Sequence, residues 1–105
     1  MLVHWGVERY TGATEKQTRL GRKLVDWGAD AVIGAHTHVL GPTERYGNGV
    51  IHYSLGNFLT RRGSRRDVAV WELVFRPGEP PAERTLHFRW NGKPAPRSAS
   101  STLRG

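Results

Sequence analysis

The 105-residue sequence contains no cysteine. Disulfide bonds and thiolate metal sites are therefore excluded, so any bound metal ion must be held by nitrogen and oxygen ligands. No apolar run approaches the roughly 20 residues that a membrane-spanning helix needs, so no membrane segment is expected in this chain. The length allows one small domain, and four Trp, three Tyr and three Phe provide for a modest hydrophobic core.

Acidic residues are scarce: nine stand against 16 basic ones, and the formal net charge is +7. Such a balance suits a polyanionic partner, including nucleic acid. The 13 arginines are scattered apart from Arg61, Arg62, Arg65 and Arg66, and they lack the aromatic interleaving that single-strand binders use. We therefore favour an arginine-rich genome as the source of the charge and do not expect nucleic acid as a partner.

The first 33 residues predict a β-α-β unit. Residues 1–4 read as a strand that ends in His4, and residues 30–33, apolar from Ala31 on, read as a second strand. Between them, Thr14 and Gln17 predict a capping box, and Gly28 predicts the end of the helix. The helix should bury an apolar stripe that consists of Leu20, Leu24 and Trp27. We interpret Trp5 and Trp27 as core aromatics.

Histidines follow both predicted strands. His36 and His38 come just after residues 31–33, and residues i and i+2 of an extended segment point to the same side. Because the carboxyl ends of parallel strands meet at one edge of a sheet, His4 should lie beside them. Imidazole is a good ligand for zinc, iron and manganese. An isolated His-x-His pair is more often incidental, but three histidines at one sheet edge predict a metal site.

The remaining residues predict further strands and loops. Residues 43–46 and 50–54 flank the turn signal Gly47-Asn48-Gly49 and predict a hairpin. Residues 67–75 are apolar on both faces and predict a long central strand, and residues 84–90 predict another. The Gly, Pro, Ser and Arg content of residues 91–105 predicts a disordered tail. We interpret His52 and His87 as structural residues.

Three segments resemble, in order and spacing, the C-terminal half of the CapA family of bacterial poly-γ-glutamate and capsule synthesis proteins, whose fold is similar to the calcineurin-like metallophosphoesterases. The resemblance covers roughly residues 1 to 75. The segments are His4-Trp5-Gly6-Val7-Glu8, Gly28-Ala29-Asp30-Ala31-Val32-Ile33-Gly34-Ala35-His36-Thr37-His38-Val39 and Tyr53-Ser54-Leu55-Gly56-Asn57-Phe58.

The resemblance implies an α/β fold: residues 1–90 would be the C-terminal part of a four-layer αββα metallophosphoesterase-like sandwich. It also implies that His4, His36 and His38 are ligands of a dimetal site for Mn, Zn or Fe. Where many relatives have a further histidine, this chain has Ala35. The family's N-terminal motifs, which bring the metal-binding carboxylates and the proton donor, are not in this sequence. We therefore expect a truncated chain without catalytic residues, which binds at most one ion weakly and is inactive alone.

Other polar residues could act beside the histidines. Glu8 could accept a hydrogen bond from an imidazole or contact substrate, although a solvent-exposed loop residue is an equally good interpretation. Asn57 belongs to a loop specific to the CapA family and could have either role. Arg61 and Arg62 could clamp an anion, although a solvated loop is the simpler interpretation.

Three functions remain open from the sequence. The first is a fragment of a CapA-like hydrolase, acting on a phosphoester or on an anionic envelope polymer such as poly-γ-glutamate once the missing N-terminal half is supplied. The second is a non-enzymatic accessory of polymer synthesis or export, or an inactive remnant. The third is a basic nucleic-acid-binding module, which only the charge suggests. The family resemblance alone indicates the cell envelope.

Overall fold

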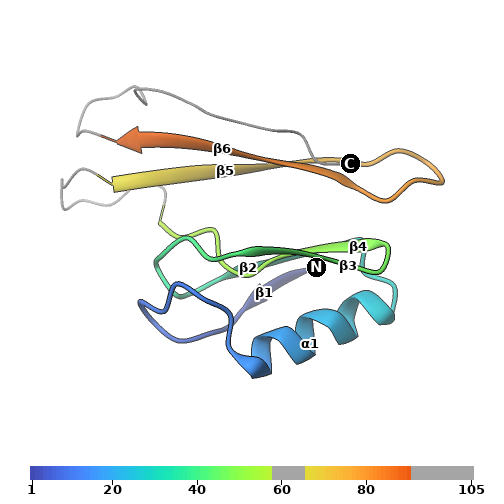
Figure 1. Cartoon of the computed structure of the whole chain (residues 1–105), viewed down its shortest axis with the longest axis horizontal. Helices are drawn as coiled ribbons and strands as arrows, with labels where there is room; N and C mark the ends of the chain where they lie inside the picture. The colour runs from blue at the N-terminus through green and yellow to red at the C-terminus, as the bar shows by residue number, and fades with distance from the viewer. Residues whose placement is uncertain (58–65, 91–105) are drawn as a thin grey trace.

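The computed structural model describes residues 1–57 and 66–90. These residues form one helix, a four-stranded sheet and a two-stranded hairpin. Figure 1 shows that they lie in three layers, with the four-stranded sheet in the middle. The fold is α/β with a mixed sheet, and no helix in the described part is long and apolar enough to cross a membrane. The elements are β1 (Leu2–His4), α1 (Glu15–Asp26), β2 (Ala31–Ala35), β3 (Thr43–Tyr46), β4 (Gly49–His52), β5 (Arg66–Val74) and β6 (Ala82–Trp90).

The middle sheet has the strand order β1-β2-β4-β3. β1 and β4 both pair in parallel with β2, and β3 pairs antiparallel with β4. The predicted β-α-β unit and the hairpin around Gly47-Asn48-Gly49 are therefore confirmed. Since β1 and β2 run in the same direction, the residues that follow both strands come out at the same edge of the sheet (Figure 1).

Local hydrogen bonds set both ends of α1, as the sequence predicts. The Thr14 hydroxyl accepts from the Gln17 backbone at 3.2 Å, and the Gln17 side chain accepts from the Thr14 backbone at 2.9 Å. At the other end, Gly28 has φ +112 and donates to Val25, while Ala29 donates to Leu24. These two bonds are those of a Schellman motif, whose left-handed residue glycine adopts without steric strain.

The face that α1 buries differs from the predicted one. Gln17 and Gly21 are its buried residues, whereas Trp27 is 72% exposed, so the interpretation of Trp27 as a core aromatic is wrong. A Cβ atom at Gly21 would lie 3.1 Å from the Trp5 ring and 3.3 Å from Ile51. The helix therefore approaches the sheet closely at its smallest residue. That rotation leaves Trp27 outside, where Lys23 lies over its ring.

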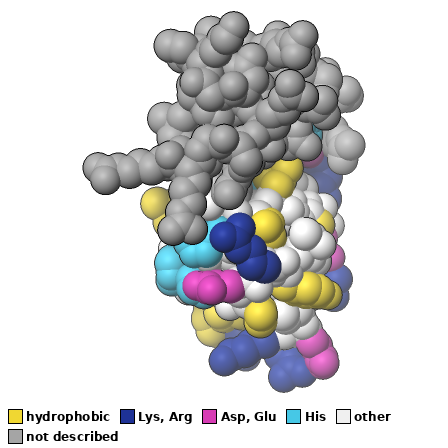
Figure 2. Space-filling model, turned by 90° about the vertical axis from the view of Figure 1, so that its left-hand side faces the viewer, with side chains coloured by type: hydrophobic (Ala, Val, Ile, Leu, Met, Phe, Trp, Pro, Cys, Tyr) yellow, Lys and Arg dark blue, Asp and Glu magenta, His cyan; other side chains and the backbone are white. Residues whose placement is uncertain are grey.

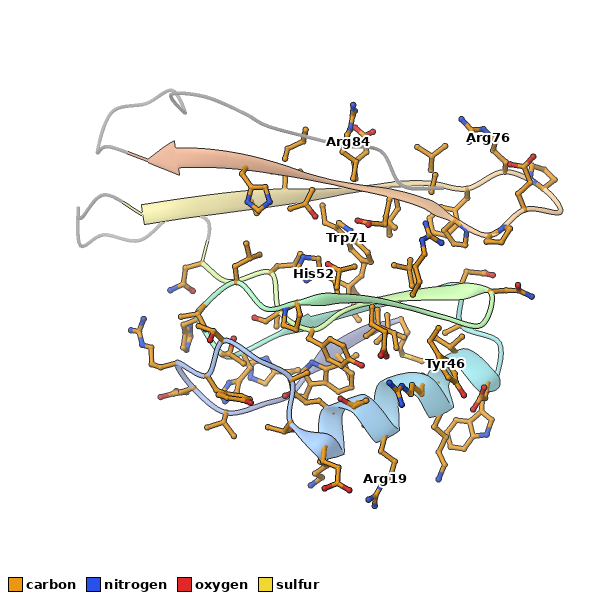
Figure 3. The ribbon with its side chains drawn as sticks, in the orientation of Figure 1. Arg19, Tyr46, His52, Trp71, Arg76 and Arg84 are labelled. Carbon is orange, nitrogen blue, oxygen red and sulfur yellow. The ribbon has the colours of Figure 1, made fainter. Side chains whose placement is uncertain are left out.

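β4 is the centre of the molecule because both of its faces are covered. Ile51 faces α1 and belongs to the core cluster with Val32 and Tyr53. The next residue, His52, points to the opposite face, as alternation along a strand requires. There its ring meets the Trp71 ring edge to face with centroids 4.9 Å apart. Figure 3 shows these two side chains between the sheet and the hairpin.

The β5–β6 hairpin is a layer of its own. Within the described residues β5 pairs with β6 alone, so the prediction that β5 would be a central strand is wrong. The face that carries Trp71 packs on the middle sheet, whereas Val70 on the other face is 42% exposed. Cross-strand bonds from Trp71 to Glu83 and from Arg84 to Glu72 join its strands. The predicted tail, residues 91–105, lies outside the described residues.

Candidate functional site

The three predicted ligands His4, His36 and His38 lie together at one edge of the middle sheet, which we call the histidine edge. His4 ends β1, and its register partner is Ala35, the last residue of β2 and the neighbour of His36. The His4 and His36 ring centroids are 4.5 Å apart, and those of His36 and His38 are 6.0 Å apart. Figure 2 shows histidine side chains gathered on this face beside acidic and basic groups.

The backbone that carries the pair is not extended. His36 has φ 118 and His38 has φ 66, both in the region that residues other than glycine seldom adopt. The argument from residues i and i+2 of an extended segment is therefore wrong here, because the chain turns through left-handed conformations. Each such residue costs roughly 1–3 kcal/mol and persists only where its surroundings impose it. The surrounding hydrogen bonds must hold this loop.

Several contacts impose the conformation of the histidine loop, residues 36–38. Thr37, between the two histidines, is 1% exposed, and its hydroxyl donates to the Val39 carbonyl. The Thr37 and Ser54 hydroxyls are hydrogen bonded at 2.8 Å. The Ser54 hydroxyl also accepts from the Gly56 backbone at 3.3 Å. This buried network joins the histidine loop to the loop after β4.

The loop after β4 brings Asn57 to His38. The Asn57 Oδ1 atom lies 3.1 Å from His38 Nδ1. Because an amide oxygen only accepts hydrogen bonds, this contact places the proton of the neutral ring on Nδ1 and leaves the lone pair on Nε2. Asn57 therefore sets the tautomer of His38, while its role at a metal or substrate site stays a prediction.

Glu8 also lies beside His38. Its Oε1 atom is 3.8 Å from His38 Nε2, and the Glu8 side chain is 66% exposed. This separation is too long for a hydrogen bond. Glu8 therefore contributes negative charge on the Nε2 side of the ring without fixing its orientation.

Trp5 fixes the end of β1, where His4 lies. The Trp5 indole Nε1 donates to the Tyr53 carbonyl at 2.9 Å, and the two rings stack with centroids 5.8 Å apart. The bond passes over Gly34, where a Cβ atom would lie 2.2 Å from the Tyr53 carbonyl oxygen and 2.3 Å from Trp5 Nε1. Only glycine fits this position, so Trp5 holds the end of β1 against β4 beside His4.

The histidine side chains do not, as placed, form a complete metal site. Within residues 1–57 and 66–90, no three His, Asp or Glu side chains are arranged so that they could hold one metal ion. The imidazoles are close, but their rings are tilted by 58° and 50° to one another. The ligand role of His4, His36 and His38 therefore stays a prediction.

A pocket that the sequence did not reveal borders His38. It has a volume of about 350 Å³, and it is lined by Arg9, Thr11, His38, Val39, Leu40, Leu55, Gly56 and Asn57. Sequence reasoning placed a possible anion clamp at Arg61 and Arg62, which lie outside the described residues, and passed over Arg9. In the sequence, the signal for a role of this segment is the neighbouring Glu8. The contact between the Arg9 segment and the histidine loop depends on the tertiary structure.

Known proteins that are similar to this chain identify its family. The family described as "Bacterial capsule synthesis protein PGA_cap" matches residues 1–62, which include the whole histidine edge. The PGA biosynthesis protein CapA of Bacillus subtilis (strain 168) is 46% identical over 63 residues, which is 60% of this chain and 17% of that protein. The capsule biosynthesis protein CapA of Bacillus anthracis is 43% identical over 64 residues, 61% of this chain and 16% of that protein.

The match covers only part of each relative and part of this chain. It covers about one sixth of each relative, and within this chain it contains β1, α1, β2, β3 and β4 but not the β5–β6 hairpin. No solved structure matches the chain. Because the family match spans more than half of the sequence, the chain belongs to the bacterial capsule synthesis family PGA_cap.

Proposed function

We propose that this chain is the histidine-bearing part of a CapA-like, metal-dependent hydrolase that acts in capsule or poly-γ-glutamate biosynthesis at the cell envelope. The observation that carries the proposal is the gathering of His4, His36 and His38 at one sheet edge of a PGA_cap family member. The names of the two Bacillus relatives supply the biological process. The substrate would be a phosphoester or an anionic envelope polymer.

The donor set supports metal binding by nitrogen ligands but is incomplete. Three neutral imidazoles suit Zn, Mn or Fe, and the tautomer of His38 leaves its Nε2 free. Two ions would need carboxylates to offset their charge, and Glu8 is the one acidic side chain with a described contact to this histidine group. The remaining ligands would come from residues outside this chain, which would also complete a four-layer αββα sandwich.

A bound metal pair would supply Lewis acidity and a water of lowered pKa. The residues of this chain would hold and orient the ions, with Asn57 setting the tautomer of His38 and Trp5 fixing the end of β1. In the described part of the chain, no three His, Asp or Glu side chains are arranged to hold one ion. We therefore expect the chain alone to bind at most one ion weakly, after the imidazoles reorient, and to turn over no substrate.

Metal titration of the purified chain tests the proposal. We expect weak binding of one Zn or Mn ion, measured by calorimetry, that His36→Ala or His38→Ala abolishes. His87→Ala is the matched control, because His87 is an exposed histidine on β6, outside the histidine edge. Binding that survives both edge variants, or that depends equally on His87, would contradict a metal role for this edge.

A second candidate function is a non-enzymatic accessory of polymer synthesis or export. The incomplete ligand set favours it, because no described triad of acidic and histidine side chains can hold an ion. The two candidates differ in a protein that joins this chain to an N-terminal half carrying the absent motifs. Metal-dependent hydrolysis of a generic phosphodiester that is lost in His36→Ala would favour the enzyme, and polymer binding without turnover would favour the accessory.

A further inference from the structure

We propose that Arg9 and the pocket beside His38 form a subsite that binds a carboxylate group of an acidic polymer. This inference rests on the proposed function, since it assumes that the histidine edge handles an anionic chain. The pocket shares His38 and Asn57 with that edge and adds one cation, Arg9. Its volume of about 350 Å³ is at the lower end of the range for ligand pockets, which suits one side group of a polymer.

The backbone of Arg9 is fixed to the histidine loop. Its N–H donates at 2.8 Å to the carbonyl of Thr37, the residue between His36 and His38. Arg9 has φ 65 and lies within a turn that a bond from the Tyr10 N–H to the Val7 carbonyl closes. A left-handed backbone at a residue with a long side chain is uncommon. The segment thus fixes the backbone of Arg9 beside the loop that carries the paired histidines.

The charge of Arg9 is available to a ligand. Three other arginines of the described residues are paired with carboxylates: Arg19 with Glu15, Arg22 with Glu44 and Arg84 with Glu72. Arg9 is exposed, and within residues 1–57 and 66–90 its guanidinium has no ion pair with an acidic side chain. A guanidinium presents a planar fork of donors that matches a carboxylate in a bidentate contact.

Glu8 approaches the Nε2 atom of His38, whereas Asn57, which lines the pocket, contacts Nδ1. Glu8 is not among the residues that line the pocket, and none of the described lining residues is acidic. Besides the oxygen that faces His38, the Asn57 amide carries two N–H donors. The pocket combines a free cation with neutral polar groups, and this combination recognises an oxyanion.

The test measures binding of a short γ-linked glutamate oligomer to the full chain by calorimetry. Arg9→Asn removes the guanidinium but tolerates the left-handed backbone, and Arg9→Gly relieves it altogether. We expect both to weaken binding about tenfold, which is the loss of a charge-assisted hydrogen bond, and Arg9→Lys to bind with intermediate affinity. Circular dichroism of each variant verifies the fold.

Arg19→Ala is the control, because Arg19 is a comparably exposed arginine paired with Glu15 on α1. Equal binding by wild type, Arg9→Asn and Arg9→Gly would overturn the subsite while leaving the metal test of the proposed function intact. Equal weakening by Arg19→Ala would overturn it in favour of nonspecific charge attraction. Arg9-dependent binding of inorganic phosphate, with no binding of the glutamate oligomer, would overturn the carboxylate assignment.

Discussion

His38 and Asn57 are joined by a contact of 3.1 Å between the imidazole Nδ1 and the amide Oδ1. The two residues are 19 positions apart, and they meet because the buried Thr37–Ser54 bond ties their loops together. The contact selects one tautomer of the neutral ring. The direction of the free Nε2 lone pair is thus set by a residue outside the His-x-His pair.

Replacing Asn57 tests this control of the tautomer. Asn57→Leu removes the acceptor, so we expect the His38 ring to populate both tautomers, whereas Asn57→Asp keeps an acceptor oxygen and should keep the proton on Nδ1. Imidazole nitrogen NMR shifts distinguish the protonated from the unprotonated ring nitrogen. His87, on β6, provides the internal reference in each sample. An unchanged His38 spectrum in Asn57→Leu would show that another group sets the tautomer.

Gly34→Ala should destabilise the fold severely. The added Cβ would stand 2.2 Å from the Tyr53 carbonyl oxygen and 2.3 Å from Trp5 Nε1, so the Trp5–Tyr53 bond and the β2 backbone cannot both stay in place. We expect a loss of about 3 kcal/mol or more in the free energy of unfolding, measured by urea denaturation.

Gly47→Asn is the matched control for Gly34→Ala. Gly47 has φ 55 and no atom within 4 Å of an added Cβ. Asparagine tolerates this backbone region, so we expect a change below about 1 kcal/mol. If Gly34→Ala is as mild as the control, the indole does not cross β2 as closely as the structure shows.

The stability of the protein should fall in mild acid because of His52. The ring is 1% exposed, its Nδ1 has no hydrogen-bond partner among the described residues, and burial lowers its pKa from 6.5 to about 4. The nearby Glu83 charge favours the protonated ring and His87 opposes it, but burial prevails. Between pH 6.5 and pH 4 the unfolded chain binds a proton that the folded chain excludes. This contribution to stability is complete above pH 6.5 and lost progressively toward pH 4.

His52→Phe removes the titration while keeping an aromatic ring against Trp71. We expect the wild-type free energy of unfolding to fall by about 3 kcal/mol more than that of the variant between pH 6.5 and pH 4. Denaturation at several pH values, followed by tryptophan fluorescence, measures the difference. Parallel pH profiles for the two proteins would contradict the assignment of the acid sensitivity to His52.

Glu44 should stabilise the packing of α1 on the middle sheet in a pH-dependent way. Both of its oxygens accept from Arg22, at 3.1 and 2.7 Å, and the Tyr53 hydroxyl donates to it at 3.0 Å. The hydrogen bond from Arg22 is the main reason why the pKa of Glu44 lies below its usual value of 4.5. Its contribution is therefore present above pH 4.5 and lost as the pH falls through the lowered pKa.

At pH 7 we expect Glu44→Gln to destabilise the protein by about 1 kcal/mol. Denaturation at pH 7 and pH 3 measures the effect, which should shrink at the lower pH. Glu15→Gln is the control, since the Glu15–Arg19 pair is exposed on both sides and should contribute little. A loss at Glu15 equal to that at Glu44 would mean that the bidentate contact adds nothing to an ordinary surface pair.

Local features of the sequence predicted both ends of α1, the hairpin turn and the histidines at the strand ends. The capping box and the left-handed Gly28 depend on hydrogen bonds among residues a few positions apart, so they can be read before any tertiary structure is known. Likewise, parallel pairing of two strands places the residues after them at one edge, which is why His4 and His36 lie together.

Long-range packing decided the features that the sequence did not predict. Close approach at Gly21 set the rotation of α1 and left Trp27 exposed, and the pairing of β5 with β6 made a separate layer from a strand that reads as central. The left-handed backbone of His36 and the position of Arg9 depend on bonds between loops distant in sequence. Residue types and spacing determined which groups reach this edge. Tertiary contacts alone decided how those groups face one another, because side-chain orientation depends on the surfaces that meet around it.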